Sequence, residues 1–185
     1  VEKDNFWGAI FLARLRTEAG KQAEALQAAG AANTNAKGPR EKTVGAAELG
    51  DALLQAGQID KARSSYQAAV DSARSLARSG ARDAQHDLSV CINKLGDLET
   101  VAKNPDKAKA LFEEDLMIAR HLAKASPESV DAQRDVIITL CKLAEVTQDK
   151  RHWSEALGAV EALEKQGRWP QSDAWMLEAL RKQAS

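Results

Sequence analysis

The sequence predicts an all-α protein, a solenoid of antiparallel helical hairpins with about nine helices. The first observation is an internal repeat: Leu49-Gly50-Asp51 returns as Leu95-Gly96-Asp97 and, in altered form, as Leu143-Ala144-Glu145. A repeat with a period of some tens of residues indicates stacked supersecondary units. The second observation is the composition, because helix formers dominate, β-branched runs are scarce and aromatic residues make up only 4% of the chain.

Apolar residues at helical spacing predict four hairpins followed by one single helix. Asp4 suits the N-cap of the first helix, and Gly20 and Gly80 suit the ends of helices. Pro39 and Pro105 suit the first turn of a helix. A single last helix would cover the end of the stack. We expect one domain, 1–185, with hairpins at approximately 4–32, 40–80, 83–126 and 131–167 and the last helix at 172–182.

The first predicted helix is apolar over most of its length. It carries Phe6, Trp7, Ile10 and Phe11, of which about half should face the next helix. The others would form an apolar surface without a partner in this chain, which indicates a neighbouring domain or a self-association surface. Because the sequence begins at Val1 instead of Met, we expect an upstream domain in a longer protein and favour it over a homo-oligomer.

The spacing of the repeated residues resembles that of the tetratricopeptide repeat. The first full repeat matches at every position of the pattern, namely Leu49, Gly50, Ala62, Tyr66 and Ala69. The next two repeats depart from it at Asp115 and Val160. Their offsets of 46 and 48 residues exceed the usual period of about 34 and are similar to the long-helix class found in kinesin light chains. The stretch 87–97 resembles long bacterial tandem repeats.

The resemblance implies a right-handed α-α superhelix and a role in protein–protein interaction. The chain would be a non-enzymatic scaffold or sensor module of a larger bacterial protein. It would bind a peptide or a helix in a concave groove lined by the first helix of each hairpin. The predicted groove residues flank the Leu-Gly positions and are Arg14, Asp51, Asn93, Asp97 and Glu145.

Two interpretations of the groove carboxylates remain open. In the first they form an acidic ridge, which would favour a partner segment with Lys or Arg. In the second they are helix-surface groups paired with neighbours such as Lys94 and Lys142. A clamp for a terminal carboxylate is not expected, since among the groove positions only Asn93 resembles the residues that relatives use for it.

The sequence predicts neither an enzyme nor a cofactor or metal site. His86, His121 and His152 occupy non-equivalent repeat positions, and neither a His-x-x-x-His nor a Cys-x-x-Cys pair occurs. Cys91 and Cys141 are too few for a disulfide framework. We therefore expect free thiols in a reducing compartment, the cytoplasm.

The charge pattern argues against nucleic acid and membrane partners. The net charge is −1 with both signs interleaved, and no apolar run approaches the roughly 20 residues of a membrane span. Two alternatives to peptide binding remain. One is an oligomerisation or spacer module whose groove is filled by its own last helix, which carries Trp175 and Met176. The other, less favoured because stacking aromatics are few, is RNA binding, which some helical repeats perform.

Overall fold

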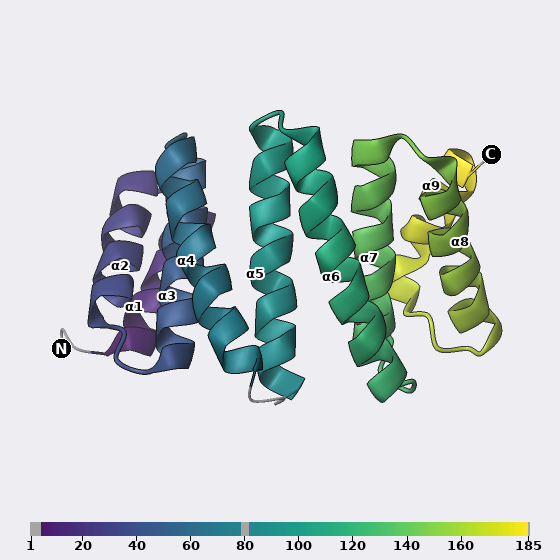
Figure 1. Ribbon diagram of the computed structural model, residues 1–185, viewed down its shortest axis with the longest axis horizontal. Helices are drawn as coiled ribbons and strands as arrows, with labels where there is room; N and C mark the ends of the chain where they lie inside the picture. The colour runs from purple at the N-terminus through teal and green to yellow at the C-terminus, as the bar shows by residue number, and fades with distance from the viewer. Residues whose placement is uncertain (1–4, 79–81, 185) are drawn as a thin grey trace. The chain divides into compact units, whose positions relative to one another are not determined.

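The computed structural model describes residues 5–78 and 82–184, apart from the side chain of Arg82. Within these ranges it contains nine α-helices, one 3-10 turn and no strand (Figure 1), which confirms the predicted all-α class of helical hairpins. The helices are α1 (Phe6–Glu18), α2 (Gln22–Asn35), α3 (Pro39–Gln55), α4 (Ile59–Ala77), α5 (Arg82–Val101), α6 (Pro105–Ala125), α7 (Val130–Thr147), α8 (Lys150–Lys165) and α9 (Ala174–Ala184), with the 3-10 turn η1 (Gln171–Asp173) before α9.

Local signals explain several of the helix ends. The side chain of Asn5 caps α1 by accepting a 3.3 Å hydrogen bond from the backbone N–H of Gly8. Gly20 has a φ of 69°, which lets the chain leave α1 as predicted. Pro39 and Pro105 occupy the first turns of α3 and α6, also as predicted. The predicted cap Asp4 and the predicted helix end Gly80 lie outside the described residues.

Helix α2 continues to Asn35, beyond its predicted end at residue 32. Ala32 is fully buried beside Phe6 and Ile10, so tertiary packing holds this last turn in place. The hydroxyl of Thr34 also donates a 2.9 Å hydrogen bond to the carbonyl of Gly30, four residues earlier. Packing therefore overrides the loop tendency of the Asn-Thr-Asn run.

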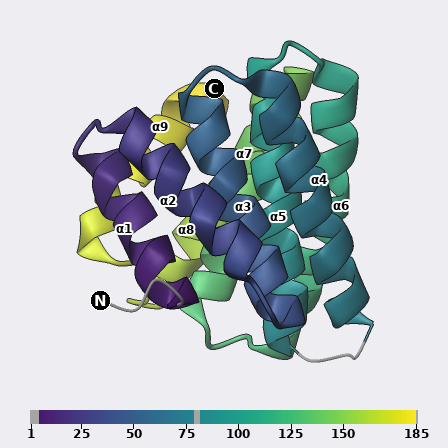
Figure 2. The ribbon, with the colours of Figure 1, turned by 90° about the vertical axis from the view of Figure 1, so that its left-hand side faces the viewer.

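The chain divides into two compact units, Val1–Ala102 and Lys103–Ser185. In the first unit each helix packs on the next, from α1 to α5, and α3 also contacts both α1 and α5. Helices α1, α3 and α5 thus form one layer, and α2 and α4 form the other. Figure 2 shows α1 and α2 in front of α3 and α4, so this hairpin ends the stack of the first unit.

Gly50 explains the repeated Leu-Gly motif in physical terms. A Cβ atom placed on Gly50 would lie 2.6 Å from two carbon atoms of the Tyr66 ring, closer than real contacts allow. Tyr66 is 2% exposed and lies on α4, the partner of α3 in the hairpin. The missing side chain at residue 50 therefore lets the aromatic ring fill the seam between the two helices.

The second unit contains α6 to α9, each packed on the next. Its core is built around the fully buried side chains of Phe112, Leu140, Leu143 and Val160. Asp115, where the repeat pattern expects a small residue, is 1% exposed. Its Oδ2 accepts a 2.8 Å hydrogen bond from the hydroxyl of Thr139 on α7, so this departure from the pattern is part of a polar contact inside the core.

Candidate functional site

The first unit has a cleft of about 390 Å³ on the layer of α1, α3 and α5. Ligand pockets usually measure about 300 to 1,000 Å³, so the cleft is large enough for one or two side chains of a partner. It is lined by Ala13, Arg14, Thr17, Glu18, Glu48, Asp51, Ala52, Leu54, Gln55, Tyr66 and Lys94.

Asp51 lies at the centre of the polar contacts in this cleft. Its Oδ1 accepts a 2.5 Å hydrogen bond from the Tyr66 hydroxyl, and its Oδ2 lies 2.6 Å from the ammonium nitrogen of Lys94. These contacts join α3, α4 and α5. Asp51 is thus paired with Lys94, as in the second interpretation of the groove carboxylates.

The phenol of Tyr66 acts as a fixed hydrogen-bond donor. Burial raises its pKa well above the ordinary value of 10.0, and the negative charges of Asp51, Asp97 and Glu48 raise it further. Asp51 contacts the phenol directly, whereas Asp97 and Glu48 act on it through their charge. The phenol stays protonated at neutral pH and can donate to Asp51.

A second ion pair crosses the cleft from α1 to α3. The guanidinium of Arg14 donates through Nε to Oε1 of Glu48 at 2.8 Å, and its Nη2 also contacts this oxygen. The hydrogen bond to Glu48 raises the pKa of Arg14. The Arg14 side chain is 59% exposed and that of Glu48 only 11%, so the arginine lies at the mouth and the glutamate at the wall.

The structure brings together only some of the predicted groove residues. Arg14 and Asp51 line the same cleft. Asn93 and Asp97 lie on α5 in the same unit but do not line it, and Lys94 between them does. Glu145 lies in the second unit. Glu48 was missed, although it precedes Asp51 by one helical turn and the spacing places both on one face of α3.

The second unit has its own pocket, of about 370 Å³. Cys141 and Glu145 line it from α7, and Trp175 and Met176 line it from α9. Burial, and then the charge of Glu145, raises the pKa of the Cys141 thiol to about 11. Burial raises the pKa of Cys91 to about 12. Both cysteines are free thiols, as expected.

The apolar residues predicted on α1 divide into two groups. Phe6 and Ile10 are buried against α2 and α3, whereas Trp7 is 53% exposed and Phe11 is 66% exposed. The ring of Trp7 meets that of Phe6 edge to face, with 4.9 Å between the ring centres. This helix therefore contributes to the core on one side and presents aromatic side chains on the other.

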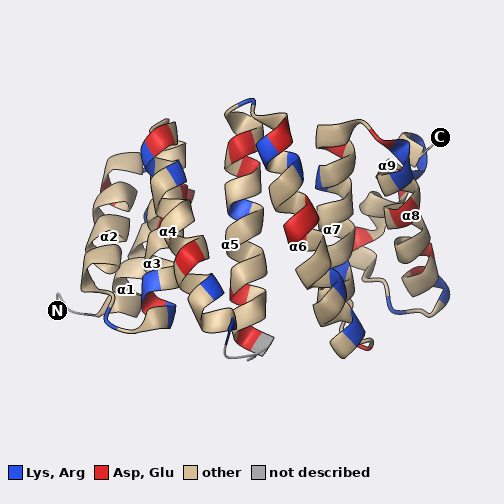
Figure 3. Ribbon diagram, viewed as in Figure 1, with Lys and Arg blue, Asp and Glu red and all other residues tan. Residues whose placement is uncertain are grey.

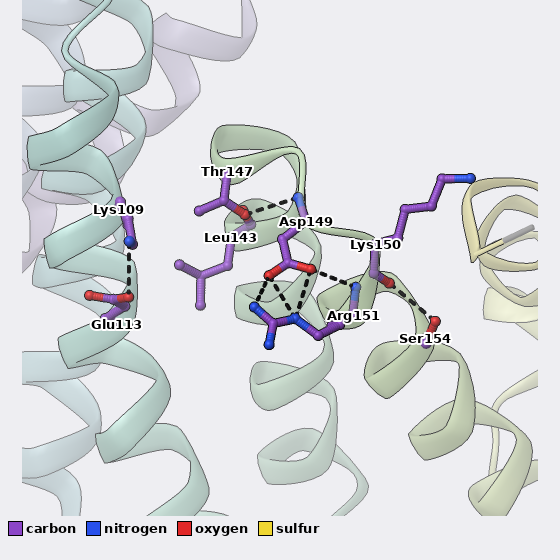
Figure 4. A network of polar contacts seen from close by, with 8 residues as sticks. All are labelled: Lys109, Glu113, Leu143, Thr147, Asp149, Lys150, Arg151 and Ser154. Carbon is purple, nitrogen blue, oxygen red and sulfur yellow. Dashed lines mark hydrogen bonds and ion pairs between the residues drawn. The ribbon is translucent and has the colours of Figure 1, made fainter.

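Charged residues outside the cleft form ion pairs, some within one helix and others between helices, such as Arg63 with Glu99. Figure 3 shows basic and acidic residues interleaved along the helices of each unit. At the turn between α7 and α8, Asp149 caps α8 and accepts hydrogen bonds from the backbone and guanidinium of Arg151 (Figure 4). The Arg151 side chain, and then its backbone N–H, lower the pKa of Asp149 to about 2. This network stabilises a helix start and faces no pocket described above.

Residues 5–78 and 82–184 contain neither a grouping of side chains typical of a metal site nor a helix suited to cross a membrane. No three His, Cys, Asp or Glu side chains are grouped there as in a metal site. No helix in these ranges is both long and apolar enough to cross a membrane.

No protein-family model matches the sequence, and no curated protein matches it significantly. Solved structures do match. BtubC (BKLC) from P. vanneervenii is 15% identical, with a TM-score of 0.52 over 92% of this chain and 77% of that one. The C-terminal part of a TPR repeat-containing protein from Cytophaga hutchinsonii is 18% identical (TM-score 0.34, 98% and 83% covered), and MamA protein is 14% identical (TM-score 0.31, 86% and 94% covered).

At 15% identity the likeness to BtubC concerns the fold alone. It agrees with the repeated Leu-Gly motif, the hairpin packing within each unit and the contact of Gly50 with Tyr66. The chain has the fold of a tetratricopeptide-like helical-repeat protein.

Proposed function

We propose that this chain is a non-enzymatic protein-interaction module that binds a peptide or a helix on the layer of α1, α3 and α5. The observation that carries the proposal is the cleft of about 390 Å³ on this layer, to which three successive first helices contribute charged side chains. Tetratricopeptide-like folds typically serve protein–protein interaction. The module would work as a scaffold or sensor within a larger bacterial protein in the cytoplasm, where free thiols such as Cys91 and Cys141 persist.

The charges of the cleft support a basic partner segment. Glu18, Glu48 and Asp51 line the cleft against Arg14 and Lys94, which leaves an excess of negative charge. Asp97 adds to the negative potential around Tyr66, as the pKa of that phenol indicates. An incoming Lys or Arg would share Asp51 with Lys94 and would approach the exposed Glu18. We propose no nucleic acid, membrane or cofactor partner.

The test is peptide binding with charge-matched probes. We would screen fluorescent peptides that differ only in Lys, Glu or neutral residues and measure the affinity of the best basic probe by fluorescence anisotropy. The Asp51→Ala/Asp97→Ala variant should weaken this affinity, and rising salt should weaken it as well. Asp71→Ala/Asp106→Ala removes the same charge from α4 and α6 and should have little effect. Unchanged affinity in the first variant would contradict the acidic ridge.

A second candidate is a spacer or oligomerisation module whose groove is occupied by α9. It is favoured by one observation: Trp175 and Met176 line the same pocket as the predicted groove residue Glu145. Hydrogen exchange over residues 172–182 separates the two cases. Protection equal to that of α7 would support a groove filled by α9, and rapid exchange would support a groove that is open to a partner.

A further inference from the structure

Helix α1 has a second apolar face that its own unit leaves uncovered. From Phe6 to Ala13 no residue of the helix is polar. One side, with Phe6, Ile10 and Ala13, is buried. The rest of its circumference exposes 53% of Trp7, 66% of Phe11, 46% of Leu12 and 47% of Leu15. A helix that is apolar on all sides is normally buried on all sides, so we expect this exposed apolar face to be covered by a binding partner.

The outer face has the spacing of a helix-pairing seam. Gly8, Phe11, Leu12 and Leu15 stand at positions i, i+3, i+4 and i+7, which form the diamond-shaped hole that receives a side chain from a facing helix. The atoms nearest to a Cβ built on Gly8 belong to the side chain of Asn5, at 3.4 Å. Within the described residues no atom of a neighbouring helix comes closer to this Cβ position than the Asn5 side chain, so a partner helix can come close to the backbone there.

The same surface carries a protrusion and a hollow on its two edges. Trp7 and Phe11 project from one edge. On the other edge a hollow of about 240 Å³ lies between α1 and α2, lined by Ala9, Leu12, Arg16, Glu24, Gln27, Ala28 and Ala31. Three alanines and Leu12 supply the apolar part of its lining, and Arg16 and Glu24 neutralise each other in an ion pair. An aromatic ring would enter it without burying an unpaired charge.

A protrusion and a hollow on opposite edges of one helix fit a second copy of the same surface. A two-fold axis along α1 brings the edge of one helix against the opposite edge of the other at equal height. In a parallel pair of helices, Trp7 of one copy then reaches Leu12 and the hollow of its partner, the relation of flanking positions in parallel coiled coils. An antiparallel pair would place the two protruding edges against each other.

The area is adequate for a specific contact of modest strength. Four side chains of this size and exposure leave roughly 400 Å² of apolar surface, within the range of functional patches on monomers. The two copies together would bury about 800 Å² of apolar surface. The polar residues around both patches bring the total buried area towards the roughly 1,200 Å² at which specific interfaces begin. Glu18 ends the seam at its C-terminal side, where two like charges would face each other.

We propose that a second copy of this chain docks on the α1 outer face, as a two-fold dimer in which the two α1 helices run parallel. The proposal goes beyond peptide binding in the cleft, because it uses the apolar first turns of α1 and the hollow against α2. Trp7 and Phe11 lie on the stripe of α1 that continues to Arg14 and Glu18 at the cleft. Sedimentation velocity from low to high micromolar concentration should show a reversible rise from the 20.0 kDa monomer to twice that mass.

Matched variants locate the contact. Trp7→Ala and Phe11→Ala remove the protruding rings and should each weaken association about 30-fold, as expected for an aromatic hot spot. Ala31→Phe fills the hollow from an exposed position and should abolish association. Trp175→Ala removes an equally exposed ring from the second unit and should leave association unchanged. A strictly monomeric chain, or a dimer insensitive to both Trp7→Ala and Ala31→Phe, would overturn the proposal.

A cross-link distinguishes the direction of the pair. Leu15 lies near the proposed axis, so Leu15→Cys places two thiols opposite each other only when the helices run parallel. A short bis-maleimide should then link the two copies, whereas the wild-type chain, whose thiols are buried or half-buried, serves as the unlinked control. A dimer that does not cross-link through Leu15→Cys contradicts the parallel arrangement and, with it, the fit of protrusion and hollow.

Discussion

The ring of Tyr66 occupies the space in which a side chain of residue 50 would lie. A Cβ on Gly50 would be 2.6 Å from two ring carbons and 3.0 Å from a third. Ring and backbone are both part of a packed seam between α3 and α4, so neither can withdraw at low cost. This contact determines how closely the helices of the hairpin approach.

We therefore expect Gly50→Ala to destabilise the protein by about 1 to 3 kcal/mol, the usual cost of overpacking. Thermal and urea unfolding followed by circular dichroism would measure the change. Gly158→Ala is the matched control, because no atom lies within 4 Å of a Cβ there and the position is inside α8. It should stabilise the protein by about 0.5 to 1 kcal/mol. Equal effects of the two substitutions would contradict the close contact.

Tyr66 is the only tyrosine of the chain, so its ionisation can be followed directly. Its pKa is raised above 10.0 by burial and by Asp51, so the folded protein should show no phenolate absorbance near pH 10. The unfolded chain releases this proton near pH 10 and the folded chain does not. The stabilisation is therefore complete below pH 10 and is lost as pH rises further. Phenolate absorbance that appears at pH 10 before unfolding would refute this.

Asp149 should make stability sensitive to acid. Its pKa is lowered from 3.8 to about 2 by Arg151, so the folded state favours the carboxylate. The contribution is present above pH 4 and disappears as pH falls through about 2. Asp149→Ala should lower the Tm at pH 7, whereas the two proteins should melt alike near pH 2. Asp131→Ala, in the first turn of α7, controls for the loss of a charge near a helix start.

Lys94 should limit the affinity of the cleft for basic ligands, because it already neutralises Asp51 at 2.6 Å. Lys94→Ala should raise the affinity of a Lys-rich probe peptide about two- to five-fold, the size expected for a partly exposed ion pair. Lys61→Ala, which removes the same charge from α4, should change it little. A lower affinity in Lys94→Ala would indicate instead that the lysine itself contacts the ligand.

The repeat made the fold predictable, because each Leu-Gly position marks a close contact between two helices, and this contact recurs along the chain. Helix ends were predicted correctly where the backbone conformation requires a Pro or favours a Gly, as at Pro39 and Gly20. The end of α2 was not predicted correctly, because the burial of Ala32 depends on residues far away in the sequence. Local pattern therefore predicts the elements better than their last turns.

The cleft was only partly predictable for a similar reason. Helical spacing placed Arg14 and Asp51 on the right layer. Pairing with Lys94 was one of two open interpretations, and the contact of Asp51 with Tyr66 was not predicted at all. Both partners come from other helices, and the spacing within one helix cannot rank them. The buried contact of Asp115 with Thr139 likewise appears only when α6 and α7 are packed together.

The raised pKa of the two cysteines bears on oxidative stress. Peroxides attack the thiolate, and a thiol with a pKa of about 11 has roughly one thiolate in ten thousand at pH 7. Cys91 and Cys141 should therefore be nearly inert to oxidants. The thioether of Met117, a residue 67% exposed on α6, needs no ionisation to form a sulfoxide. Among the cysteine and methionine sulfurs of the described residues, that of Met117 is thus more open to oxidative damage than either thiol.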